Sequence, residues 1–70
     1  MKFHFFTLIK GSDLGNMAVD RSEMNFPNEL EAHKFALRAA ALVVKEGVSV
    51  EISARRKLSG PEVFNVKRAA

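Results

Sequence analysis

The clearest alternation of hydrophobic and polar positions lies between residues 48 and 56. The apolar positions are Val48, Val50, Ile52 and Ala54, and the polar positions between them are Ser49, Glu51, Ser53 and Arg55. A period of two residues directs the two sets to opposite faces of a strand. We therefore predict a strand over about 48–56 in a sheet that has one face in water.

Three further strands are predicted from weaker patterns of β-branched and aromatic residues bounded by turn formers. They span about residues 1–10, 16–22 and 62–68. Clusters of turn-forming residues at 11–16 and 56–61 are expected to join the strands in pairs. Phe5 and Phe6 are adjacent in the first strand, so we expect either a strand buried on both faces or a bulge at this point.

A helix is predicted over about 29–46. Asn28 precedes it as an N-cap, and Glu31 follows three residues later in a variant of the capping box. Gly47 suits the position just after the last turn. At about 100° per residue, one apolar stripe is expected to face the sheet. Its members are Leu30, His33, Leu37, Ala40, Ala41 and Val44.

The order of these elements is ββαββ, within a single domain at 1–70. It predicts an α+β fold in which an antiparallel four-stranded sheet has one helix packed on one face. If the helix returns the chain beside the first strand, the spatial order of the strands is 2-1-3-4. The alternative places the third strand beside the second and parallel to it, and the pattern leaves both orders open.

The predicted helix carries more apolar side chains than one stripe needs. Phe35 and Leu42 lie about 120–140° around the helix from that stripe. One interpretation is a second apolar surface that another subunit or a partner protein covers. The other is that the sheet curls around the helix, or that the segment with Met24 and Phe26 folds over Phe35.

For the open face of the sheet, too, the question is whether a partner covers its apolar side chains. If Phe5 and Phe6 point to opposite faces, one of them is exposed or covered by a partner, and the edge strands are open to pairing. We therefore predict a protein interface that includes Phe35, Leu42 and Phe6. The expected partners are a second copy of the chain, in a homodimer, and an unidentified protein.

The composition excludes several classes of catalytic and metal-binding chemistry. The chain has 70 residues and no cysteine, which excludes thiol catalysis, cysteine zinc sites and a disulfide framework. Its two histidines, His4 and His33, lie in no metal-binding or catalytic motif, and the glycines at 11–15 lack the Lys-Ser/Thr of a P-loop. We expect no catalytic residue, no metal, no cofactor and no enzymatic activity.

No segment predicts insertion into a membrane or export. No stretch approaches the ~18 apolar residues of a membrane span. The apolar run after Lys2 is too short and too often interrupted for a signal peptide. We therefore expect a cytoplasmic protein with no membrane partner.

The formal net charge of +3 is unevenly distributed. Residues 1–33 carry a net charge of −2, whereas residues 34–70 carry +5. Most of the excess is expected in two patches at opposite ends of the second hairpin. They consist of Arg55, Arg56 and Lys57, and of Lys67 and Arg68. Such patches can contact phosphates, so nucleic-acid binding is an alternative function, although no exposed strand alternates aromatic and basic residues.

The layout resembles two groups of small proteins. The aromatic strand Phe3-His4-Phe5-Phe6, the Glu-Ala-x3-Ala-Leu helix at 31–37 and a closing hairpin through Gly60 resemble short bacterial proteins of unknown function. Size and the wrapping of one helix by strands are similar to small phage-encoded inhibitors, including anti-CRISPR proteins and phage inhibitors of host RNA polymerase. The resemblance implies non-enzymatic binding, and it transfers no functional residue.

We accordingly expect a small, non-enzymatic protein-interaction module. It is expected to self-associate and to act by binding a macromolecular partner. One alternative is a nucleic-acid-binding protein that uses the basic second hairpin. Another is a phage-type inhibitor of a host nucleoprotein complex.

Overall fold

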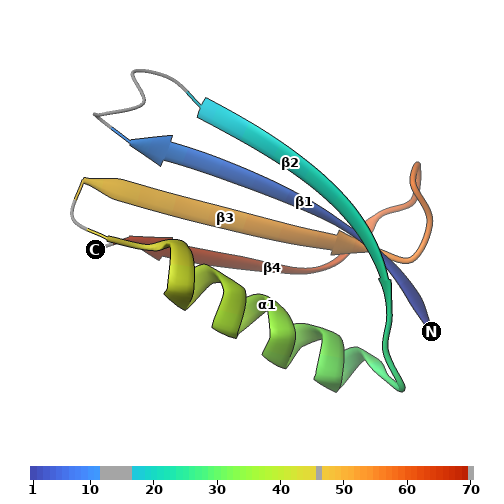
Figure 1. The fold of residues 1–70 in the computed structure, drawn as a ribbon. Coiled ribbons are helices and arrows are strands. Elements are labelled where there is room, and N and C mark those ends of the chain that lie inside the picture. Colours follow the sequence, from blue (N-terminus) through green and yellow to red (C-terminus); the bar gives the residue numbers. More distant parts are fainter. Residues whose placement is uncertain (12–16, 46, 70) are drawn as a thin grey trace.

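Over the residues that it describes, 1–11, 17–45 and 47–69, the computed structural model contains four strands and one helix (Figure 1). The elements are β1 (Lys2–Gly11), β2 (Met17–Asn25), α1 (Glu29–Val43), β3 (Val48–Arg55) and β4 (Glu62–Ala69). This confirms the predicted ββαββ layout. The predicted turn at 11–16 lies, apart from Gly11, outside the described residues.

β1 and β3 lie in the middle of the sheet, whose strand order is β2-β1-β3-β4. β1 pairs antiparallel with β2 on one side and with β3 on the other, and β4 pairs antiparallel with β3. α1 returns the chain along the sheet, so β3 starts where β1 finishes, with Val48 opposite Gly11. The order 2-1-3-4 is therefore confirmed, and the alternative with the third strand beside the second is wrong.

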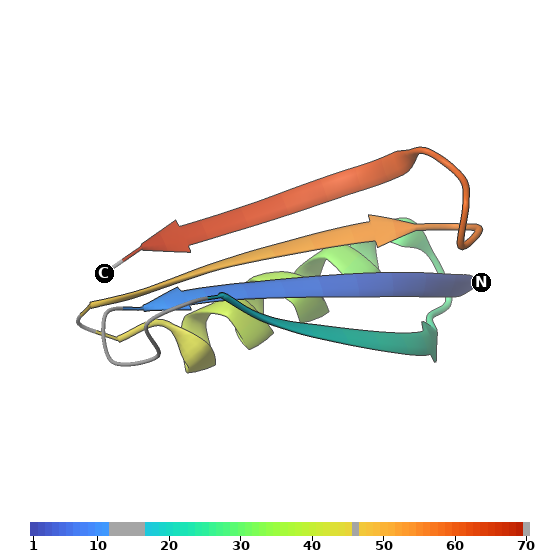
Figure 2. The ribbon, with the colours of Figure 1, turned by 90° about the horizontal axis from the view of Figure 1, so that it is seen from above.

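α1 covers one face of the sheet and leaves the other open. It packs mainly against β3 and β4 and crosses the strands obliquely (Figures 1 and 2). We call the covered side the helix face and the other side the open face. Because α1 is displaced toward β4, one flank of the helix lies near the β4 edge of the sheet.

The hydrophobic core fills the helix face. Phe3 and Phe5 of β1 are the largest fully buried side chains, and inward residues of β3 and β4 surround them. These are Val50, Ile52, Ala54 and Val66. Phe6 points to the open face, where it lies opposite Arg21 and Ser53 in an unshifted register. β1 therefore has no bulge, and it is not buried on both faces, because Phe6 stays partly exposed.

The inner side of α1 consists of alanines. Ala32, Ala36 and Ala40 are buried, whereas Leu30 and Leu37 are 61% and 43% exposed. The prediction that these two leucines face the sheet is therefore wrong. The phenylalanines of β1 fill the space under the helix, so only small side chains fit on its inner side.

The start of α1 agrees with the prediction, and the end of β2 does not. Asn28 Oδ1 accepts a hydrogen bond from the Glu31 backbone N–H at 2.9 Å, which confirms the N-cap. β2 continues to Asn25 rather than to about 22. Beyond β2, the Phe26 N–H donates to the Met1 carbonyl at 2.8 Å, which holds the start of β1 against this extension.

α1 ends at Val43, earlier than the predicted end near 46. Val44 is extended, with ψ of 130°, and so breaks the helix. Gly47 has a φ of 79°, a left-handed conformation that glycine adopts without strain. The Val48 N–H bonds to the Lys45 carbonyl at 2.9 Å across it. Gly47 thus belongs to the turn into β3 and not to a helix C-cap.

Candidate functional site

The three residues predicted to form a protein interface lie in different places. Phe35 is partly buried, Leu42 is 87% exposed, and Phe6 lies on the open face. They do not form one surface. The interface itself stays a prediction.

Phe35 packs inside the chain. Its ring centroid lies 5.7 Å from that of Phe5 and 5.4 Å from that of Phe26. The segment after β2 therefore covers it, as the second interpretation of the sequence expected. A partner is not needed to bury Phe35.

Leu30 and Leu37 are exposed on the side of α1 near β4. The ring of His33 stacks on Phe64 of β4, with centroids 4.7 Å apart, which fixes the orientation of the helix. At about 100° per residue, both leucines lie within about 60° of His33 and farther from the sheet. We call the surface of Leu30 and Leu37 the β4 flank of α1.

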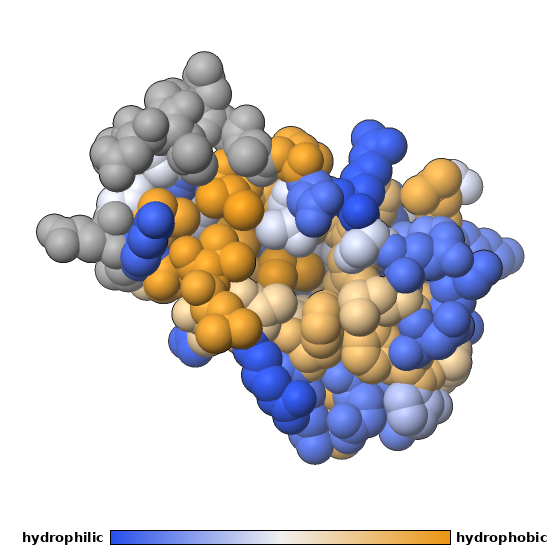
Figure 3. All heavy atoms as spheres, in the orientation of Figure 1, coloured by the Kyte–Doolittle hydropathy of each residue, from blue (hydrophilic) through white to orange (hydrophobic). Residues whose placement is uncertain are grey.

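Leu42 lies on the opposite flank of α1. It is separated by about 20° from Phe35, which contacts Phe5 and Phe26. Ile9 and Val43 are only partly buried, and Figure 3 shows an apolar area between the C-terminal half of α1 and the neighbouring part of the sheet. The helix is therefore apolar on both flanks.

Two arginines converge on Phe6 at the centre of the open face. The guanidinium carbons of Arg21, from β2, and Arg55, from β3, lie 5.6 Å and 5.3 Å from the ring centroid. Both distances fall within the roughly 6 Å range of cation–π contacts. Phe6 therefore sits between two guanidinium groups supplied by its two neighbouring strands.

Arg55 is the more firmly held of the two. Its Nη1 donates to the Gly60 carbonyl at 3.0 Å, which ties the end of β3 to the β3–β4 loop. Its Nε is buried and has no hydrogen-bond partner among the described residues. Arg21 is exposed and contacts Phe6 from the edge strand.

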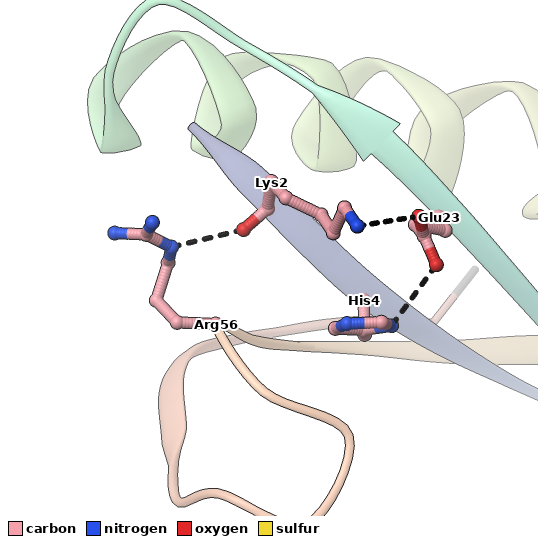
Figure 4. A network of polar contacts seen from close by, with 4 residues as sticks. All are labelled: Lys2, His4, Glu23 and Arg56. Carbon is pink, nitrogen blue, oxygen red and sulfur yellow. Dashed lines mark hydrogen bonds and ion pairs between the residues drawn. The ribbon is translucent and has the colours of Figure 1, made fainter.

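Two carboxylates of β2 lie near Arg21, and both are engaged. Asp20 Oδ1 accepts a hydrogen bond from the Arg21 backbone N–H at 2.9 Å. Glu23 lies 3.2 Å from Lys2 Nζ and 3.8 Å from His4 Nδ1 (Figure 4). Among the described residues, the ion pairs involve Lys2, His4 and Lys34, and none involves an arginine. The guanidinium groups of Arg21 and Arg55 thus form no ion pair among the described residues.

The basic residues predicted to bind nucleic acid lie at opposite ends of the β3–β4 hairpin. Arg56 Nε donates to the Lys2 carbonyl at 2.9 Å (Figure 4). Its guanidinium lies 5.2 Å from the Phe3 ring centroid. Lys57 is exposed in the loop. At the other end, Lys67 lies opposite Glu51 and Arg68 opposite Val50, so these two point to different faces. The five residues do not form one patch.

The described residues give no geometry for a metal site or a membrane span. No group of three or more His, Asp or Glu side chains gathers in a way that could hold an ion. No helix in the described part of the chain is long and apolar enough to cross a membrane.

Comparisons with protein-family models, curated proteins and solved structures give no match for this chain. The resemblance to short bacterial proteins and phage inhibitors stays a prediction.

Sequence reasoning missed Arg21, Leu30 and Leu37. Arg21 joins Phe6 only through the register of β1 and β2, which no local pattern in the sequence gives. Leu30 and Leu37 were assigned to the core because their spacing is helical and the apolar arc is wide. The signal for the inner side of the helix is the set of alanines spaced by four residues, Ala32, Ala36 and Ala40.

Proposed function

We propose that the chain is a non-enzymatic binding module that works as a homodimer. The observation that supports the dimer is the placement of side chains around α1, where the small ones face the sheet and large apolar ones face water. The helix packs alanines against its own sheet and exposes Leu30 and Leu37 to water. Covering a leucine completely is worth roughly 1.5–3 kcal/mol, so a partner at this flank is favourable.

A second copy of the chain fits this flank. α1 packs mainly over β3 and β4, so it lies near the β4 edge of the sheet. Two copies that meet at their β4 edges around a twofold axis would bring their helices side by side on one face, where helices pack at about 8–10 Å.

The twofold arrangement is consistent with the positions of the side chains. Leu37 lies near the middle of α1, so the twofold axis brings Leu37 of one chain close to the same residue of the other. Leu30 then faces the C-terminal half of the partner helix. Lys34 and Arg38 lie on the outer side of the helix and stay in water, so the dimer does not bury them.

Sedimentation velocity over a concentration series tests this dimer. We expect the wild type to be a dimer and Leu37→Ser to be a monomer that is still folded by circular dichroism. Leu42→Ser is the matched control, since it makes the same change on the opposite flank, and it should remain dimeric. A wild type that is monomeric at every concentration, or a dimer lost in Leu42→Ser and kept in Leu37→Ser, would overturn the proposal.

A further inference from the structure

We propose that the open face binds single-stranded nucleic acid, with Phe6 as the stacking centre and Arg21 and Arg55 as the phosphate ligands. This names the partner of the proposed binding module, and it rests on that function but not on the dimer. Phe6, Arg21 and Arg55 all come from one chain. The site also differs from the predicted basic hairpin, with which it shares only Arg55.

The first argument is charge. Arg21 and Arg55 are positioned on the open face without an ion pair among the described residues. Glu23 contacts Lys2 and His4, and Asp20 accepts a hydrogen bond from the Arg21 backbone N–H. Glu51 and Glu62, the latter opposite Arg55, both accept hydrogen bonds from Asn65 Nδ2. Neither guanidinium group is held by a carboxylate, so both can donate to the phosphate oxygens of a ligand.

The second argument is the chemistry of the guanidinium group. Arginine stacks on aromatic faces and offers a planar fork of N–H donors that matches phosphate oxygens. Contact with the Phe6 ring, together with the bond from Arg55 to Gly60, restrains both groups before any ligand binds. A base can stack on the guanidinium planes that lie over Phe6, while the N–H donors of the same groups bind phosphates.

The third argument is spacing. The open-face residues of β1 (His4, Phe6, Leu8 and Lys10) follow one another at about 6.6–6.8 Å. A splayed single strand can place its bases at this spacing. A duplex keeps its base faces stacked inside the helix and so offers none to the open face.

The shape of the open face agrees with this spacing. Shallow depressions of about 230, 170 and 440 Å³ follow β1 from one end to the other. Arg21 lines the first, Phe6 the first and second, and Leu8 the second and third. Val19, at 62% exposure, adds apolar surface beside Phe6. Apolar hollows next to guanidinium groups suit nucleobases better than they suit the carboxylates of an acidic protein.

Fluorescence anisotropy with a labelled oligothymidylate and a labelled oligouridylate of about 12 nucleotides tests the proposal. At about 50 mM salt we expect saturable binding, with log K falling linearly against log salt by roughly 0.7 per phosphate contacted. A duplex of the same length should bind at least about fivefold more weakly. Polyglutamate serves as the acidic-polymer probe and should not compete.

Single substitutions locate the site. Arg21→Ala is the main variant because Arg21 is exposed, so the fold does not depend on it. We expect about a fivefold or larger loss of affinity and a smaller salt slope. Phe6→Leu should lose affinity by a similar factor but keep the wild-type slope of log K against log salt. Arg38→Ala removes the same charge from the outer side of α1, and its affinity for the oligonucleotide should fall by less than about twofold.

Several outcomes would overturn the inference. These are no binding at low salt, equal binding of duplex, competition by polyglutamate, or an equal loss in Arg38→Ala and Arg21→Ala. Leu37→Ser separates this inference from the dimer. If that monomer still binds the oligonucleotide and Arg21→Ala does not, the open-face site stands whatever the oligomeric state.

Discussion

The two faces of the sheet are built from the same alternating strands and have opposite character. On the helix face, Phe3 and Phe5 are completely enclosed, and no polar side chain is buried among the described residues. On the open face, Phe6 lies partly exposed between two guanidinium groups. An aromatic ring stabilises the fold on one face, whereas on the other it contributes little to stability and remains accessible to a ligand.

The largest difference between the faces should appear when neighbouring phenylalanines are truncated. Phe5→Ala should cost about 3–5 kcal/mol because it leaves a cavity in the core, which is a large part of the stability of a small domain. Phe6→Ala should cost less than about 1 kcal/mol, mainly through lost cation–π contacts. Urea unfolding followed by circular dichroism measures both, and equal losses would remove the distinction between the faces.

A second contrast concerns the two sides of α1. Ala36 is completely buried against the sheet, so Ala36→Leu should overpack the core and cost about 1–3 kcal/mol. Ala41 is exposed, and Ala41→Leu should change the free energy of unfolding by no more than about 0.5 kcal/mol. Thermal unfolding compares the pair. A neutral Ala36→Leu would contradict the packing of α1 against the sheet through its alanines.

The two open-face arginines should differ in their effect on stability. Arg55→Ala removes the bond to Gly60, and a hydrogen bond is typically worth about 1 kcal/mol. Arg21→Ala removes only an exposed contact with Phe6 and should cost about 0.5 kcal/mol or less. Denaturant midpoints of the two variants test this order. The reverse order would mean that Arg55 does not hold the β3–β4 loop.

The smallest effect is expected at the exposed ion pair of β1 and β2. Glu23→Gln weakens the contacts with Lys2 and His4 and should cost about 0.5 kcal/mol or less. The cost should shrink further at high salt because the pair is exposed. Unfolding at low and high salt checks this, and a loss above about 1 kcal/mol would contradict it.

Much of the fold could be predicted from the sequence. The period of two in β3 and the Asn28 cap gave the strand and the helix start directly, since both depend on local chemistry. The end of α1 was predicted too late, because Val44 and Lys45 have no helix-breaking side chain of their own. The sheet order was one of two alternatives, which only tertiary pairing distinguishes.

The candidate sites were less predictable. Arg55 and Phe6 were both singled out, but for different functions, because their contact depends on the register between β1 and β3. The helical period did not show which apolar side of α1 faces inward, since apolar residues occupy most of its circumference. The packing of Phe35 against Phe26 was one of two open interpretations, and only the folded chain distinguishes them.

The most direct test of the division between the two faces is an oligonucleotide titration followed by ¹H–¹⁵N spectra of the folded protein. Chemical-shift changes should concentrate on β1, β2 and β3 around Phe6, Arg21 and Arg55. The amides around Leu37 on α1 should stay unchanged. Changes concentrated on α1, or no changes at saturating oligonucleotide, would contradict a binding face opposite the helix.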